Sequence, residues 1–325
     1  MTLADPQTLE IPEGLRDAIL SWYDRVGRDL PFRRTLDPYA ILVSEAMAQQ
    51  TQAARAGAAW GGFMERFPTV VALAAATPAE VLRAWHGLGY NRRALNLWRA
   101  AKQIVEEHQG RVPADLAALE ALPGVGPYTA RAVAAIAFGV PVGAVDTNVR
   151  RVLGRIVAGD AAALTASAMQ LLADAAVPRD RPGPWTHALM DLGASLCGPS
   201  TQLCGSCPAQ TWCRFSRAGS TRRRLAATGR PGRGSPGSGT SARSSADPFP
   251  ATSRWLRGRI VARLRASVGD DWVAIDAPIG SHDAPAVRAA IIGLARDGLV
   301  ELDAAMTGVG ADADRSRWLV RLPLA

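Results

Sequence analysis

Four cysteines lie within 17 residues of one another, and the chain contains no others. Cys197, Cys204, Cys207 and Cys213 follow the spacing C-x6-C-x2-C-x5-C. Four thiolates from one short loop can hold a metal ion or an iron–sulfur cluster. Disulfides would require an oxidising compartment, and residues 1–10 lack the basic and apolar regions of a secretory signal. We therefore expect a metal or cluster site, and the spacing alone is compatible with zinc or with iron–sulfur.

Residues 12–214 show the apolar spacing of amphipathic helices throughout. In the first helix, apolar side chains recur every three or four residues, at Leu15, Ile19, Trp22, Tyr23 and Val26. Thr77 and Glu80 have the spacing of a capping box, which predicts a helix that continues to Trp85. We expect further helices at about 91–108, 114–121, 127–138, 147–157, 164–176 and 184–196. Because no alternating run predicts a strand here, this part of the chain is expected to be all-α.

The composition changes sharply after the cysteines. Residues 216–250 are mostly Gly, Ser, Pro and Arg, which predicts a flexible linker between a domain at 1–215 and a module at 251–325. The module is expected to be a small α+β, winged-helix-like unit. We predict its helices at 255–266 and 284–296, followed by a two-stranded hairpin at 299–302 and 318–322.

The net charge of +8 comes from one segment. Residues 214–243 contain eight arginines and no acidic residue, and the rest of the chain holds 29 basic and 29 acidic residues. The segment is either a solvated tether or a sequence-independent phosphate binder. No run of 18 apolar residues predicts a membrane span, and without an export signal we expect a cytoplasmic protein.

Two Gly/Pro-rich loops adjoin predicted helix starts. Gly124, Val125 and Gly126 precede one helix, where backbone N–H groups can bind a phosphate, although such a stretch is more often only a turn. A second loop, at 139–145, leads to Asp146 in front of another helix. An aspartate there is commonly just an N-cap.

Taken in order, the hairpin, the loop ending in aspartate and the cysteine loop resemble the helix-hairpin-helix base-excision glycosylase superfamily. The resemblance covers about residues 12–215. It implies a two-lobed all-α fold, a [4Fe–4S] cluster on the four cysteines and DNA contacts by the hairpin. It also implies that Asp146 stabilises the positively charged sugar that forms as the base leaves, which is an electrostatic role.

Residues 44–52, Ser-Glu-Ala-Met-Ala-Gln-Gln-Thr-Gln, resemble the corresponding stretch of adenine DNA glycosylases. The apolar neighbours of Glu45 should raise its pKa, so that it can donate a proton. The resemblance implies that Glu45 protonates N7 of adenine and later helps to activate water. It also implies that Gln50 wedges into the base stack and that Tyr90 intercalates beside the damaged guanine.

The hairpin of strand-cutting relatives carries a lysine that forms a Schiff base, and Tyr128 occupies that position here. Lys102 is the only lysine in the chain, so we expect a monofunctional enzyme. The resemblance places Tyr128 in the adenine pocket and Asn148 where it can orient water or the carboxylate of Asp146. His187 stands where relatives have a Gln or Glu that touches adenine.

These observations predict a bacterial, nucleoid-associated, monomeric glycosylase. It is expected to remove adenine opposite G or 8-oxoguanine from double-stranded DNA. Residues 251–325 do not resemble the Nudix-like domain that reads 8-oxoguanine in many relatives. Two alternatives stay open: a thymine or uracil mismatch glycosylase of the same superfamily, and a non-catalytic, cluster-bearing DNA-binding protein.

Overall fold

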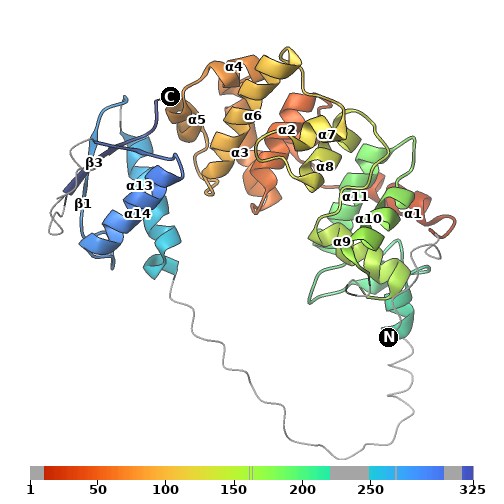
Figure 1. Cartoon of the computed structure of the whole chain (residues 1–325). Coiled ribbons are helices and arrows are strands. Elements are labelled where there is room, and N and C mark those ends of the chain that lie inside the picture. The colour runs from red at the N-terminus through yellow and green to blue at the C-terminus, as the bar shows by residue number, and fades with distance from the viewer. Residues whose placement is uncertain are drawn as a thin grey trace, which may run out of the picture. The chain divides into compact units, whose positions relative to one another are not determined.

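The computed structural model describes residues 11–160, 162, 164–219, 249–267, 269–303 and 317–324. They form two compact units, each built from two separate stretches of chain (Figure 1). The first unit falls within Met1–Glu45 and Val112–Pro236, and the second within Ala46–Arg111 and Gly237–Ala325.

The first unit is helical. Its elements are α1 (Leu15–Val26), η2 (Pro31–Arg33), the part of α2 (Pro38–Ala48) up to Glu45, α7 (Leu116–Glu120), α8 (Pro127–Ala137), α9 (Thr147–Leu153), η3 (Gly154–Ala158), α10 (Ala166–Ala176), α11 (Pro182–Ser195) and η5 (Cys204–Ser206). Helix α11 packs against α1, α8 and α9. Its core includes Leu15, Ile19 and Trp185, each at most 1% exposed. Burial of such apolar side chains is the main force that holds the helices together.

The second unit contains α3 (Ala53–Arg66), α4 (Val70–Ala75), α5 (Pro78–Ala84) and α6 (Arg92–His108), followed by η6 (Phe249–Ala251), α13 (Ser253–Ala266), β1 (Val273–Asp276), α14 (Ala284–Arg296), β2 (Glu301–Leu302) and β3 (Arg317–Arg321). The capping box predicted at the start of α5 is confirmed. Thr77 Oγ1 accepts the Glu80 N–H at 3.2 Å, and Glu80 Oε2 accepts the Thr77 N–H at 2.9 Å. These bonds satisfy backbone donors that would otherwise lack partners.

The small sheet has the strand order β1-β3-β2, and both pairings are antiparallel. Val273 pairs with Val320, and Glu301 pairs with Arg321. In Figure 1, α13 and α14 lie side by side next to β1 and β3. The predicted two-stranded hairpin was therefore incomplete, because β1 precedes α14 and is the principal partner of β3. Strand β1 has only four residues, too few to give a clear alternating pattern.

The predicted fold class, a helical glycosylase-type fold with a small C-terminal α+β module, is confirmed. The domain boundaries at 215/216 and 250/251 stay a prediction. Most of the predicted linker, residues 220–248, lies outside the described residues. Within the described part of the chain, no helix is both long and apolar enough to cross a membrane.

Candidate active site and DNA-contacting loops

Glu45 lies on α2 in the first unit with only 8% of its surface exposed. Its helix neighbours Ile41, Leu42 and Met47 are each at most 2% exposed, as the apolar sequence around it predicted. A carboxylate in such surroundings loses the hydration that stabilises its charge. Burial is accordingly the largest influence on this group, and it raises the pKa of Glu45 from 4.5 to about 7.

Three side chains of the same unit modify the pKa of Glu45. The hydroxyl of Tyr128 hydrogen-bonds to the Glu45 carboxyl and lowers its pKa, while the charge of Asp146 raises it and that of Arg33 lowers it. Burial raises the pKa of Tyr128 itself well above 10, so its phenol stays protonated and acts as the donor. Glu45, Tyr128 and Asp146 come from three separate helical segments, yet Tyr128 and Asp146 lie close enough to Glu45 to influence its pKa.

Asp146 is the N-cap of α9. Its Oδ1 accepts the backbone N–H of Val149 at 2.7 Å, and its Oδ2 accepts Asn148 Nδ2 at 2.8 Å. The preceding loop reaches this position because Gly143 lies directly on α10. A Cβ on Gly143 would stand 2.6 Å from the backbone carbon of Ala173. Asp146 therefore has both predicted features. It caps the N-terminus of α9, and its carboxyl group also lies near Glu45.

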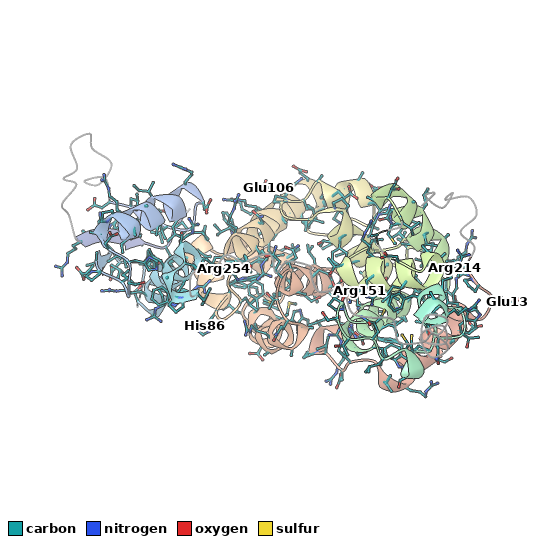
Figure 2. All side chains as sticks on the ribbon, turned by 90° about the horizontal axis from the view of Figure 1, so that it is seen from below. Glu13, His86, Glu106, Arg151, Arg214 and Arg254 are labelled. Carbon is teal, nitrogen blue, oxygen red and sulfur yellow. The ribbon has the colours of Figure 1, made fainter. Side chains whose placement is uncertain are left out.

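Arg151, which is labelled in Figure 2, connects the Asp146 segment to the cysteine loop by hydrogen bonds. Its guanidinium donates to Asn148 Oδ1 at 2.8 Å, to the carbonyl of Gly193 at 2.7 Å and to the carbonyl of Cys197 at 2.6 Å. Because Asn148 in turn donates to Asp146, one continuous chain of hydrogen bonds runs from the cysteine loop to the site. This connection was not predicted from the sequence.

Arg33 and Asp191 form a buried ion pair beside the site, which sequence reasoning also missed. The Arg33 guanidinium donates to both carboxylate oxygens of Asp191, at 2.8 Å each, and the two side chains are 7% and 2% exposed. Arg28 adds a second guanidinium at 2.6 Å. The sequence contained one indication of this ion pair. Asp191 is the single acidic residue in the otherwise apolar part of α11, and a charge buried among apolar side chains needs a partner.

His187 also lies on α11, near the Tyr23 ring. Burial, reinforced by the positive charge of Arg33, lowers the pKa of His187 to about 3. Its imidazole is therefore neutral at physiological pH and offers one donor and one acceptor.

The predicted hairpin joins α7 to α8. Gly124 has φ +79°, a conformation that favours glycine, whereas Gly126 is the extended N-cap of α8 and meets nothing within 4 Å of an added Cβ. The Val125 amide donates to the Leu122 carbonyl at 3.0 Å. A ligand can therefore approach the backbone closely at Gly126. The Val125 N–H, in contrast, already donates a hydrogen bond within the turn.

Gln50 and Tyr90 lie in the second unit. Both have a left-handed backbone, with φ of 54° and 44°, which is uncommon outside glycine and asparagine. Tyr90 is 40% exposed although it is a large aromatic residue. Strained residues of this kind persist when the surrounding structure holds them and often occur at functional sites.

Arg93 holds the Gln50 and Tyr90 loops together. Its guanidinium donates to the carbonyls of Ala46 and Met47 at 2.7 and 2.8 Å, and to Thr51 Oγ1 at 3.0 Å. It also reaches the Gly89 carbonyl at 3.3 Å and lies 5.6 Å from the centroid of the Tyr90 ring. Sequence reasoning missed Arg93, because its partners are mainly carbonyl groups that the fold turns toward it.

The four cysteines line one small cavity in the first unit. Apolar side chains such as Val152, Ile156 and Leu192 form much of the remaining wall. Burial raises the pKa of the Cys207 thiol to about 11, so a thiolate there requires nearby positive charge. Arg155 Nη1 lies 3.4 Å from Cys197 Sγ. Among the described residues, no group of three or more His, Cys, Asp or Glu side chains is placed to hold a single metal ion.

Comparisons with known proteins identify the family of the chain. Residues 43–176 match the family described as HhH-GPD superfamily base excision DNA repair protein. The chain is 44% identical to an adenine DNA glycosylase of Mycobacterium tuberculosis over 253 residues, which cover 77% of this chain and 78% of that protein. It is also 44% identical to the human adenine DNA glycosylase over 211 residues, 61% of this chain and 39% of the human protein.

Solved structures give the same fold. A thermostable thymine-DNA glycosylase superposes with a TM-score of 0.59 at 30% identity and covers 62% of this chain and 95% of its own. An endonuclease III–DNA covalent intermediate superposes with a TM-score of 0.56 at 24% identity, covering 66% and 99%. The match to the family model and the 44% identity over 77% of its length show that the chain belongs to the adenine DNA glycosylase family of the HhH-GPD base-excision repair superfamily.

Proposed function

We propose that this protein hydrolyses the N-glycosidic bond of adenine opposite G or 8-oxoguanine in double-stranded DNA, acting as a monomer. The observation that carries the proposal is the meeting of Glu45, Tyr128 and Asp146. One carboxyl of this group has a pKa near 7 and is therefore substantially protonated at neutral pH. Its neighbour Asp146 accepts two hydrogen bonds, which fix the orientation of its carboxyl group.

The reaction uses the two carboxyl groups differently. Protonated Glu45 donates its proton to N7 of adenine, and the C1′–N9 bond then breaks with its electron pair going to the base. The sugar becomes a cation, which the Asp146 carboxylate stabilises electrostatically. Glu45, now a carboxylate, takes a proton from water as the water oxygen bonds to C1′. Two carboxyls with separate acid and anion roles follow the logic of glycoside hydrolysis.

Neighbouring side chains fix the geometry of the reaction. Tyr128 donates to Glu45 and forms part of the adenine pocket. Asn148 holds one oxygen of Asp146 in place by donating to it at 2.8 Å. His187 faces the base as a neutral imidazole, whose donor and acceptor can serve the polar edge of adenine.

DNA is held by the hairpin and by the two strained loops. Gly124, Val125 and Gly126 contact a phosphate at the start of α8, where backbone N–H groups favour an anion. Gln50 fills the space left by the extruded adenine. The Tyr90 ring intercalates between the bases beside the damaged guanine. Their left-handed backbones and their attachment to Arg93 support this role, since a wedge must be rigid.

The proposal includes a monofunctional mechanism. A Schiff base requires a primary amine, and Tyr128 carries a phenol at the position of the hairpin lysine. The only lysine of the chain, Lys102, lies over the Trp98 ring at 5.0 Å from its centroid. The product is therefore an intact strand with an abasic site.

Cys197, Cys204, Cys207 and Cys213 are proposed to hold a [4Fe–4S] cluster. The donor set fits, because four sulfur atoms line one largely apolar cavity and Arg155 supplies positive charge near Cys197. When bound, the cluster fixes the loop that accepts a hydrogen bond from Arg151, and so it supports the Asn148–Asp146 segment. No chemical step is assigned to it.

A second candidate is removal of thymine from T·G pairs, because a thymine-DNA glycosylase is among the similar structures. The Glu45 segment favours adenine, since N7 is the atom that a nearby carboxylic acid can protonate and thymine has no such nitrogen. The 44% identity to adenine DNA glycosylases favours the same choice.

The test incubates the protein with duplexes that hold A opposite 8-oxoguanine, A opposite G, or T opposite G, and reveals abasic sites with alkali. We expect cleavage of the adenine strand only after alkali, and none with the Glu45→Gln variant. Cleavage at T·G would support the second candidate. Strand cleavage without alkali would contradict the monofunctional mechanism.

A further inference from the structure

We infer that helix α13 forms a second DNA-binding surface, which contacts backbone phosphates beside Tyr90. This inference rests on the proposed function, because it assumes that Tyr90 enters the base stack. It assigns a role to the C-terminal module, for which the sequence alone suggested no specific contact.

The first observation is a cleft within the second unit. It is lined by Gln50 and Tyr90 and by three arginines of α13, Arg254, Arg257 and Arg259. A strand held by the two loops would therefore lie directly against this helix. Gln50 and Tyr90 are both exposed.

The second observation is the charge of the cleft. Five arginines line it, including Arg254 and Arg259, against a single acidic residue, Asp297. Asp297 is shared by Arg257 and, at 3.8 Å, by Arg92. Arg254 and Arg259 form no salt bridge within the described residues, and both are exposed. Exposed arginines without an acidic partner attract the phosphate backbone.

The third observation is the contact between Arg254 and Tyr90. The Arg254 guanidinium lies 4.1 Å from the centroid of the Tyr90 ring. A planar guanidinium can remain stacked on an aromatic face while its N–H groups bind a phosphate. Arg254 can therefore accompany Tyr90 to the DNA and bind the backbone next to the inserted ring.

The helix is held beside this loop by contacts of its own. Arg265, near the end of α13, donates to Asn91 Oδ1 at 2.7 Å, and Asn91 directly follows Tyr90. Arg83 on α5 donates to Asp270 at 3.1 Å. These contacts hold α13 close to the loop that carries Tyr90.

The occupant that fits is a nucleic-acid backbone. The cleft is strongly positive, continues from the loops proposed to enter the duplex, and carries exposed arginines beside apolar side chains such as Trp255 and Leu294. An acidic protein segment would share the charge but would not explain why the arginines adjoin Gln50 and Tyr90.

The test measures the affinity of the full chain for a duplex that carries a tetrahydrofuran abasic analogue opposite guanine, by fluorescence anisotropy at several salt concentrations. The Arg254→Ala/Arg259→Ala double variant is compared with Arg263→Ala. Arg263 is also on α13 and half exposed, but it does not line the cleft and lies 3.8 Å from Asp276. Thermal melting confirms that each variant is folded.

We expect the double variant to bind at least tenfold more weakly, with the slope of log affinity against log salt reduced by about 2. The Arg263→Ala variant should bind like the wild type. Equal affinities and slopes for all three proteins would overturn the inference, as would a loss of the same size in Arg263→Ala. If the wild type removes no adenine at all, the proposed function fails, while the binding measurement still tests the surface.

Discussion

Replacing Glu45 by glutamine should stabilise the protein at alkaline pH even though it removes activity. Glutamine has nearly the same shape as glutamate but cannot ionise. The wild type must bury a carboxylate above pH 7, because the pKa of Glu45 is about 7 in the folded protein. The variant avoids that cost.

The size of the effect follows from the two pKa values. Below pH 4.5 the carboxyl is protonated in both folded and unfolded chains and has no effect on the pH dependence of stability. Between 4.5 and about 7 the unfolded chain releases its proton while the folded chain keeps it, so stability falls as pH rises. At about 1.4 kcal/mol per pH unit, the free energy of unfolding of the variant relative to the wild type should rise by about 2.5 kcal/mol from pH 5 to pH 8.

The assay is urea unfolding of both proteins at pH 5, 6, 7 and 8, followed by tryptophan fluorescence. Taking the difference between variant and wild type cancels the titration of all other groups. Glu120→Gln is the matched control for exchanging a carboxyl for an amide, because Glu120 is an exposed residue at the end of α7. A Glu45→Gln difference that stays constant or falls with pH would refute the account of this carboxyl.

Three further changes test other parts of the structure. Cys207→Ser should lower the iron content and the absorption at about 400 nm. Stoichiometric zinc without iron in the wild-type protein would contradict the presence of the cluster. Asp191→Asn leaves Arg28 and Arg33 without their carboxylate and should lower the free energy of unfolding in urea by about 3–5 kcal/mol. A decrease below about 1 kcal/mol would show that the ion pair is not needed for stability. Arg93→Lys keeps the charge but cannot reach the same carbonyls together, so we expect several-fold weaker DNA binding with the protein still folded, and unchanged binding would argue against its role in holding the loops.

Local sequence signals predicted most of the helices. Thr77 with Glu80, Asp146 before α9 and Gly110 after α6 are signals that act over one helical turn, and they stand at or next to helix ends. The strand β1 was missed because its pairing with β3 joins residues more than 40 positions apart. Such pairing is decided by tertiary structure and leaves little mark on a four-residue segment.

The site was predictable where a motif carried it. The stretch around Glu45 and the loop before Asp146 each pointed to a carboxylate, but their meeting across about 100 residues is a property of the fold. Arg93 gave no signal, because an arginine at the start of a surface helix is usually solvated. Asp191 gave a weak signal, because it is an acidic residue among the apolar residues of α11.

The central claim is that protonated Glu45 donates the proton that releases adenine. The most direct measurement is the single-turnover rate of adenine removal from an A·8-oxoguanine duplex between pH 5.5 and 9, with enzyme in excess. Because the pKa of Glu45 is about 7, the rate should be level in acid, fall through a midpoint near pH 7 and then decrease about tenfold per pH unit. A rate that stays constant up to pH 9, or a Glu45→Gln variant as fast as the wild type, would contradict the claim.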